Sequence, residues 1–395
     1  MQPSNRALMH SIARAHLLDL LRKRGSLARS ELATLVGFEK KHITNIVTKL
    51  AAEGLVHEVG QRQAGIGRPL KLLDLDGSRR VAGLHLEPGR MRGVVVDWRG
   101  TKQATAEVEF AGTATPAVVR RTASALLARL ASSGKKTSSG KKPPSGKKIP
   151  AEQLEGLGLA LPAIIDPVSG KILRSVNLPK LEGASLGDLL PADAAPRTFI
   201  ENSANALALA EKWFGHGRDA RDLVCVELGV GVGAGIVIDR RLYRGAGLFA
   251  GELGHVRIAA DGPVCSCGAR GCLEGWLGWD RLTAALGGAE SLPATESELS
   301  RSQRATLIAA AERLGQALAV IVNLLNPRLL VLSGNVMRYQ GLFVPAVEAA
   351  LARAALPDCL QGLTISTTRD PFQGALGAAC LALAERFEVD GHYAT

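Results

Sequence analysis

The first 76 residues show hydrophobic positions at helical spacing, interrupted by glycines. Residues 8–24 carry one apolar face, and Gly25 ends this predicted helix. Ser30 is the expected N-cap of a short second helix that stops at Gly37. A third helix is predicted over residues 40–53. The last two helices and the glycine-containing turn between them form the helix-turn-helix pattern, in which the second helix enters the major groove of DNA.

The helix predicted over residues 40–53 has two distinct faces. Its apolar stripe consists of Ile43, Ile46, Val47 and Leu50. On the polar side, Thr44 and Asn45 suit base edges, whereas the lysines suit phosphates. The residues of this helix expected to meet DNA are Lys40, Lys41, His42, Thr44, Asn45 and Lys49. The alternative is a helical protein-interaction domain with solvated charges.

A polar, glycine-rich loop from Gly60 to Gly67 separates two short strand-like stretches, Leu55-Val56 and residues 70–75. Two strands around such a loop form the wing of a winged helix. Arg68, next to Pro69, makes a short extended basic element that suits a narrow minor groove. Element order, charge and turn positions therefore predict that residues 1–76 are a winged helix-turn-helix domain that binds double-stranded DNA.

Beyond residue 80, strand patterns alternate with helical ones in two sets. The first set has strands at 81–86, 92–97, 105–110 and 156–161, with a helix that ends at Leu130. The second set has strands at 198–200, 223–227 and 234–238, and helices at 204–214 and 305–325. This alternation predicts an α/β protein with two similar lobes, which we place at residues 77–200 and 201–395.

The net charge of +11 is concentrated in two segments. Residues 1–76 contain 12 Lys and Arg against 7 Asp and Glu, and residues 131–150 contain six lysines and no acid. The rest of the chain is balanced, as expected for a nucleic-acid-binding module joined to a neutral domain. Segment 131–150 lacks an apolar run and is expected to be a disordered insertion in the first lobe. It is either a solvated loop or an accessory electrostatic arm for DNA.

The composition, 46% apolar and 22% charged, excludes a wholly disordered or fibrous chain. The longest apolar stretch, residues 223–238, contains Glu227 and several glycines, so it does not predict a membrane helix. The first residues lack the charged-then-apolar pattern of a signal sequence. We therefore expect a cytoplasmic protein that makes no contact with a membrane.

Three of the six cysteines lie within eight residues, and a histidine precedes them by ten. One histidine and three thiolates complete the tetrahedral ligand set of a closed structural zinc site, whereas a disulfide is disfavoured in a reducing compartment. The predicted zinc ligands are His255, Cys265, Cys267 and Cys272. The other cysteines stand in apolar strand or helix contexts and are expected in the core; they are Cys225, Cys359 and Cys380.

Five stretches of the large domain carry specific motifs. They are GLGLALPAIID (156–166), IENSANALALAE (200–211), LGVGVGAGIVIDRRLYRGAGLFAGELGHV (228–256), CSCGARGCLEG (265–275) and NLLNPRLLVLSGN (323–335). Together with the N-terminal module, this combination resembles the ROK family of repressors and sugar kinases over nearly the whole chain. The resemblance implies a two-lobed, actin-like (ribonuclease H-like) ATPase-type domain with a sugar in the cleft, assembled as a homodimer or homotetramer.

The resemblance also implies which residues hold a small sugar or sugar-phosphate effector. Carboxylates and amides supply the paired acceptors and donors that vicinal hydroxyls require. His255 can bind zinc through one ring nitrogen and face the sugar with the other. The implied sugar-binding residues are Asn202, Ser203, Glu252, His255 and Glu274.

Three features that a kinase of this family would carry are missing. In place of an Asp-x-Gly-x-Thr-like turn, residues 83–90 contain His85 and the pair Glu87-Pro88, which puts a negative charge where phosphates would lie. The family's Asn-Asp pair is Asn202-Ser203 here, and serine is a poor proton acceptor. Val230 stands where kinases tend to have a hydroxyl residue. These losses predict a sensor rather than an enzyme.

The sequence therefore predicts a sugar-responsive transcriptional regulator, a repressor of carbohydrate metabolism genes, whose degenerate sugar-kinase domain acts as the sensor. Two alternatives stay open. One is a DNA-tethered sugar kinase, and the other is a repressor controlled by a protein partner. Sugar-dependent ATP turnover and sugar-dependent release of operator DNA separate the three.

Overall fold

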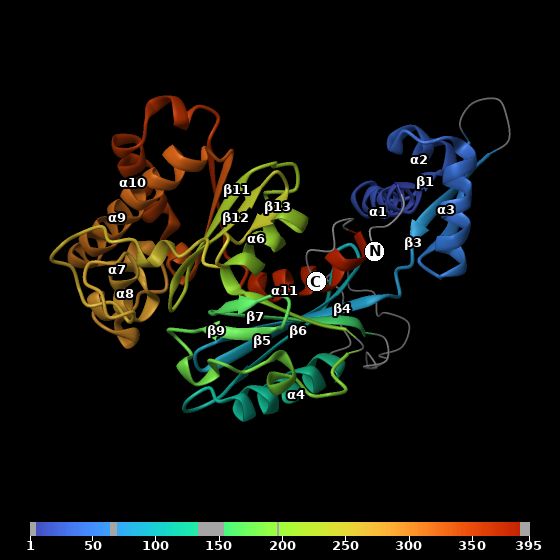
Figure 1. The fold of residues 1–395 in the computed structure, drawn as a ribbon. Coiled ribbons are helices and arrows are strands. Elements are labelled where there is room, and N and C mark those ends of the chain that lie inside the picture. The colour runs from blue at the N-terminus through green and yellow to red at the C-terminus, as the bar shows by residue number, and fades with distance from the viewer. Residues whose placement is uncertain (1–4, 64–68, 133–153, 196, 388–395) are drawn as a thin grey trace.

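The computed structural model describes residues 5–63, 69–132, 154–195 and 197–387. In these residues the chain forms an N-terminal domain and two larger lobes (Figure 1). Arg68 and most of segment 131–150 lie outside the described residues, so the predictions made for them stay predictions.

The N-terminal domain is a winged helix-turn-helix, as predicted. Its helices are α1 (Asn5–Arg24), α2 (Arg29–Val36) and α3 (Lys40–Ala52). Its antiparallel sheet has the order β1-β3-β2, with strands β1 (Leu27–Ala28), β2 (Val56–Arg62) and β3 (Leu70–Leu75). Gly25 and Gly37 have φ angles of 81° and 75°, a conformation that favours glycine and explains why helices end there.

The predicted N-cap of α2 is wrong. Ser30 lies inside the helix, and Ala28 occupies the N-cap position. The Ala28 N–H donates a hydrogen bond of 2.8 Å to the Glu31 carboxylate. The Glu31 carboxylate therefore satisfies the N–H of the N-cap residue, as the acid of a capping box does, and Ala28 itself supplies no side-chain cap.

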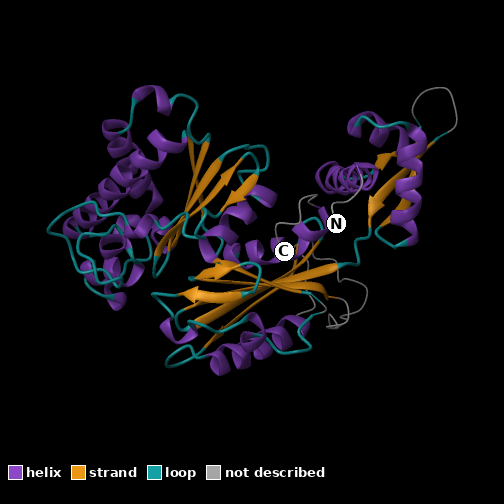
Figure 2. Ribbon diagram, in the orientation of Figure 1, coloured by secondary structure: helices purple, strands orange, loops and turns teal. Residues whose placement is uncertain are grey.

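The first lobe is built on a five-stranded sheet in the order β10-β7-β4-β5-β6. Its strands are β4 (Arg80–Glu87), β5 (Arg90–Asp97), β6 (Lys102–Glu109), β7 (Leu154–Leu161) and β10 (Thr198–Asn202). Helix α4 (Pro116–Ser132) covers one face and α11 (Gln373–Phe387) the other (Figures 1 and 2). A small hairpin of β8 (Ile164–Asp166) and β9 (Lys171–Arg174) and the short α5 (Leu186–Leu189) complete the lobe.

The second lobe has a five-stranded sheet in the order β13-β12-β11-β14-β15. Its strands are β11 (Leu223–Leu228), β12 (Val232–Ile238), β13 (Arg241–Tyr243), β14 (Leu329–Gly334) and β15 (Thr364–Thr368). Its helices are α6 (Ser203–Phe214), α7 (Glu274–Leu277), α8 (Trp279–Ala285), α9 (Arg301–Leu325) and α10 (Gln340–Ala354). In both lobes the first three strands are antiparallel, the fourth pairs in parallel with the first, and the fifth pairs in parallel with the fourth. The prediction of two similar lobes is therefore confirmed.

Helices α6 and α11 pack tightly against each other and against the sheets, because glycines let backbones meet. A Cβ atom at Gly158 would lie 1.8 Å from the Ala378 carbonyl oxygen, and one at Gly377 would lie 1.8 Å from that of Ala206. The C-terminal helix α11 therefore returns to the first lobe, although the predicted boundary groups it with the second. The division at residues 76 and 200 stays a prediction.

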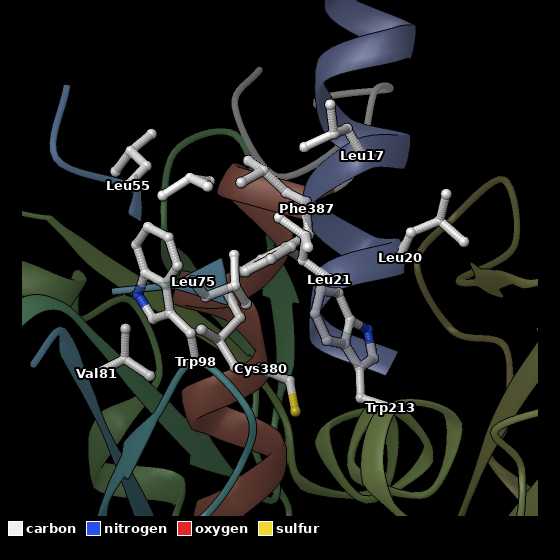
Figure 3. Close-up of a cluster of buried hydrophobic side chains, with 14 of the residues drawn as sticks. Leu17, Leu20, Leu21, Leu55, Leu75, Val81, Trp98, Trp213, Cys380 and Phe387 are labelled. Carbon is white, nitrogen blue, oxygen red and sulfur yellow. The ribbon is translucent and has the colours of Figure 1, made fainter. Parts of the chain in front are cut away.

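An apolar cluster joins the N-terminal domain to the lobes (Figure 3). Leu17 and Leu21 of α1 are fully buried there, beside Phe387 of α11. The Phe387 ring makes edge contacts with Trp98 and Trp213, with ring centroids 5.4 and 5.9 Å apart. This continuity of the core ties the position of the DNA-binding domain to both α6 and α11.

Helix α9 is long and apolar enough to cross a membrane by length and composition, the one such helix in the described residues. Half of its most apolar 18-residue window is buried in the protein, where α9 packs along α10. That arrangement is typical of the core helix of a large lobe.

Candidate functional site

One cavity in the cleft between the lobes is lined by all five residues predicted to bind sugar. They are Asn202, Ser203, Glu252, His255 and Glu274. Asn202 ends β10 and Ser203 begins α6, whereas Glu252 and His255 lie just before and in a short 3-10 helix that follows β13, and Glu274 begins α7. The structure thus brings these residues together, and their role in sugar binding stays a prediction.

Asn202 is largely committed to the backbone around it. Its side-chain oxygen accepts hydrogen bonds from the N–H groups of Ala204 and Asn205 at 2.9 and 3.2 Å, which makes it the N-cap of α6. Its side-chain nitrogen donates to the Ala163 carbonyl at 3.0 Å. One amide hydrogen is left for a ligand, so Asn202 positions the start of α6 more than it offers recognition groups.

Glu274 and Glu252 face the cavity from the second lobe. The Glu274 carboxylate accepts hydrogen bonds from the Val232 N–H at 3.0 Å and from the Ser266 hydroxyl at 2.7 Å, which fixes its orientation. Burial raises the pKa of the Glu252 carboxyl; the nearby Glu274 adds to this effect, and His255 opposes it. The two carboxylates, of which Glu274 is held in place by hydrogen bonds, provide acceptors for ligand hydroxyls.

Glu227 and His85 also line the cavity, although the sequence pattern did not predict them as ligand-binding residues. The Ser203 hydroxyl donates a hydrogen bond of 2.7 Å to Glu227, and the His85 Nε2 lies 3.6 Å from the other Glu227 oxygen. Burial raises the pKa of the Glu227 carboxyl, while His85 and Ser203 lower it. The signal available in the sequence was a lone carboxylate inside the apolar strand LVCVEL.

The four predicted metal ligands form a compact cluster. One ligand atom from each of His255, Cys265, Cys267 and Cys272 lies within 4.8 Å of the others. The Cys265 sulfur is 3.6 Å from His255 Nδ1, and the sulfurs of Cys267 and Cys272 are 3.8 Å apart. Zn–S bonds of ~2.3 Å and Zn–N bonds of ~2.0 Å in a tetrahedron give separations of about this size. The donor set fits a metal ion.

His255 connects this cluster to the cavity. While its Nδ1 faces the Cys265 sulfur, its Nε2 lies 3.7 Å from the Glu252 carboxylate. The loop is shaped by Gly271, which has a φ of 75° and leaves no room for a Cβ atom beside the Ala259 carbonyl oxygen. His255 therefore belongs both to the histidine–cysteine cluster and to the lining of the cavity.

The candidate DNA-binding surface is the outer face of α3. Its four stripe residues are buried, and Lys40, Lys41, Thr44, Asn45 and Lys49 are exposed. The Thr44 hydroxyl donates to the Lys40 carbonyl at 2.8 Å, so towards DNA it can only accept. His42 is half-buried because its ring stacks on Phe38, with centroids 5.2 Å apart. Among the predicted DNA contacts on this helix, His42 is the least available.

Residues 147–385 match the ROK family. The chain is 28% identical over 376 residues to the xylose repressor of Caldicellulosiruptor bescii, which covers 88% of this chain and 89% of that protein. The fold of this chain is similar to that of a ROK family transcriptional regulator, a homolog of the E. coli MLC protein. The TM-score is 0.79 and the identity 21%, and the match covers 97% of this chain and 98% of that one. The fold is also similar to that of a ROK family glucokinase from Streptomyces griseus in complex with glucose and AMPPNP. Here the TM-score is 0.61 and the identity 23%, and the match covers 76% of this chain and 98% of that one.

Fold and site thus define a winged helix-turn-helix protein whose larger part is a two-lobed, actin-like domain of the sugar-kinase type. The match extends over more than half of the chain. The protein belongs to the ROK family.

Proposed function

We propose that this protein is a sugar-responsive transcriptional regulator that represses genes of carbohydrate metabolism. Helix α3 and the wing bind double-stranded operator DNA, and a small sugar or sugar phosphate in the lobe cleft releases it. The observation that carries the proposal is the combination, in one chain, of an exposed basic recognition helix with a cleft lined by five polar residues suited to hydroxyls. Similarity to a xylose repressor over most of the chain supports it.

The protein acts in the cytoplasm as a homodimer or homotetramer, because helix-turn-helix regulators pair two recognition helices with two half-sites about one DNA turn apart. Its cleft does not transfer phosphate. Glu87 lines the cleft and pairs with Arg92 at 2.5 Å, which places a carboxylate where phosphates would lie. A DNA-tethered kinase would show ATP turnover that rises with sugar, and we expect none above background.

The function is tested by release of DNA. A duplex selected in vitro for tight binding to the purified protein serves as operator, and the panel is D-xylose, D-glucose, N-acetylglucosamine and their phosphate esters. We expect one member to lower operator affinity some 5- to 150-fold, the range of a coupling of about 1–3 kcal/mol. If no member changes operator affinity, the sugar-sensing function is wrong and control by a protein partner becomes the better reading.

Glu252→Ala should leave operator binding intact and weaken the effector response. Loss of a charged hydrogen-bond acceptor costs about 1.5–3 kcal/mol, so the effector concentration needed for half-release should rise about 10-fold or more. Fluorescence anisotropy of the labelled duplex, with and without the best sugar, measures both quantities. An undiminished response would remove Glu252 from the pocket. Glu290→Ala, in the same lobe but outside the cavity lining, is the matched control.

Two substitutions on α3 should weaken DNA binding in different ways. Asn45→Ala should cost about 1–3 kcal/mol at one base pair and relax specificity there. Lys49→Ala should weaken binding to all sequences and reduce the slope of log affinity against log salt by about 1. Titrations at several salt concentrations on selected and random duplexes distinguish the two outcomes. Equal loss on both duplexes for Asn45→Ala would contradict a base contact.

The metal is a structural zinc ion held by His255, Cys265, Cys267 and Cys272. Thiolate and imidazole donors at tetrahedral separations favour zinc, and four protein ligands leave no open position for chemistry. Bound there, zinc would supply a crosslink that holds the loop carrying Ser266 and Glu274 in place.

A further inference from the structure

Glu227 is an unusual residue for its place in the fold. It lies in the central strand β11, between the buried Val226 and Leu228, and its register partners on the neighbouring strands are Gly233 and Ser333. An ionised carboxylate in such surroundings is costly unless it is paired or reaches a polar site. Its side chain is 20% exposed, so it opens onto the cleft rather than being sealed in the core.

The Glu227 carboxylate joins three elements from the two sides of the cleft. One oxygen accepts the 2.7 Å hydrogen bond from Ser203, the first residue of α6, and the other lies 3.6 Å from His85 on β4. Ser203 and His85 are almost completely buried. The carboxylate therefore has a defined orientation, and each of its oxygens retains acceptor capacity.

The side chains of residues 203 and 227 are in direct contact, so only one of these two positions can carry a carboxylate without repulsion. An aspartate at 203 would bring a second carboxylate into direct contact with Glu227, and two such groups repel each other or must share a proton. The resemblance noted from the sequence implies an acid at position 203, where this chain has serine. The acid is supplied instead from β11 of the second lobe, and the serine hydroxyl orients it.

We propose that Glu227 is an effector-binding residue of the cleft, which accepts a hydrogen bond from a ligand hydroxyl at the position that the resemblance assigns to residue 203. His85 and Ser203 are its positioning residues. The ligand class is a neutral polyol face, because the group exposed there is an acceptor. This inference rests on the proposed function and adds to it the residue that accepts a hydrogen bond from one hydroxyl of the effector.

The first test is Glu227→Gln, which keeps the shape and removes the charge. The effector concentration needed to release the selected duplex should rise roughly 10- to 100-fold, the loss of one charged hydrogen bond. Operator affinity without sugar and metal content should not change. Asp222→Asn, directly before the other end of β11 and outside the cavity lining, is the matched control and should behave as wild type.

The second test exchanges the two positions. Ser203→Asp alone should weaken the response, because it places two acids side by side. Ser203→Asp combined with Glu227→Thr keeps one acid and a β-branched hydroxyl residue suited to a strand, and it should recover the response to within a few-fold of wild type. This rescue distinguishes ligand recognition from a structural role, since a merely structural Glu227 would leave the double variant worse than either single one.

The outcomes separate this inference from the function on which it rests. If wild-type protein responds to a sugar and Glu227→Gln responds equally well, the inference is overturned and the proposed function stands. If the losses of effector response in the two single variants add up in the double variant instead of being rescued, the claim that Glu227 takes the place of an acid at position 203 is overturned. If wild-type protein responds to no member of the panel, the proposed function and this inference fail together. Thermal unfolding of each variant confirms that it is folded.

Discussion

Replacing Cys267 by serine will remove the metal from the protein and with it the response to effector. Wild-type protein purified without added zinc should contain about one equivalent per chain, and Cys267→Ser close to none, because a closed site needs all four ligands. The loop then loses its crosslink, and the Ser266 hydroxyl no longer holds Glu274 at 2.7 Å. Effector binding should therefore fall below detection at millimolar sugar, whereas operator binding should persist. Metal analysis and anisotropy titrations measure the two effects.

Cys359→Ser is the matched control, since Cys359 is a half-buried thiol in the same lobe that does not belong to the cluster. It should keep full metal content and full response. Full zinc content in Cys267→Ser would refute the ligand set. Loss of metal with an unchanged response would show that the loop holds its shape without the ion, and the proposed link between metal and effector would then be wrong.

The parts of the fold that depend on local periodicity were predictable from the sequence. The α3 stripe predicted a buried face at Ile43, Ile46, Val47 and Leu50, and all four are buried. The two sets of strands predicted two similar lobes, because each strand repeats an apolar pattern before a glycine or polar turn. The cluster of one histidine and three cysteines was predictable from spacing, since three cysteines within eight residues need only a loop to meet.

The parts that depend on contacts distant in sequence were not predictable in this way. Helix α11 lies on the first sheet because Gly158, which has no side chain, leaves room for the helix backbone at Ala378. These two residues are about 220 positions apart in the sequence. Helix α2 begins at Arg29, so Ser30 lies inside it, and the Glu31 carboxylate accepts a hydrogen bond from the N–H of the N-cap residue Ala28. Glu227 acquired a role only when the fold brought β11 against Ser203. The motif assigned Asn202 to the pocket, but most of its hydrogen-bonding capacity is used in capping helix α6.

The cleft and the DNA-binding domain are connected by helix α6. Its first residue, Ser203, lines the cavity, and Trp213 near its end contacts α1 of the winged helix-turn-helix domain. The Arg22 guanidinium lies 4.6 Å from the centre of the Trp213 ring and donates to the Trp213 carbonyl at 3.1 Å. A ligand can shift operator affinity only through contacts that differ between two states, and this interface is where a movement of α6 reaches the DNA-binding domain.

Arg22→Ala is therefore expected to uncouple the two sites while each keeps its own ligand. The variant should bind operator within a few-fold of wild type and bind sugar normally, but the 5- to 150-fold release by sugar should shrink towards none. Lys23→Ala is the control, because Lys23 is the next residue on α1 and pairs only with Asp19, at 2.8 Å, among the ion pairs of the described residues. Calorimetry gives the sugar affinity and anisotropy gives the operator affinity. Linkage is reciprocal, so operator DNA should also cease to weaken sugar binding in Arg22→Ala, and a variant that retains the full release would place the coupling elsewhere in the interface.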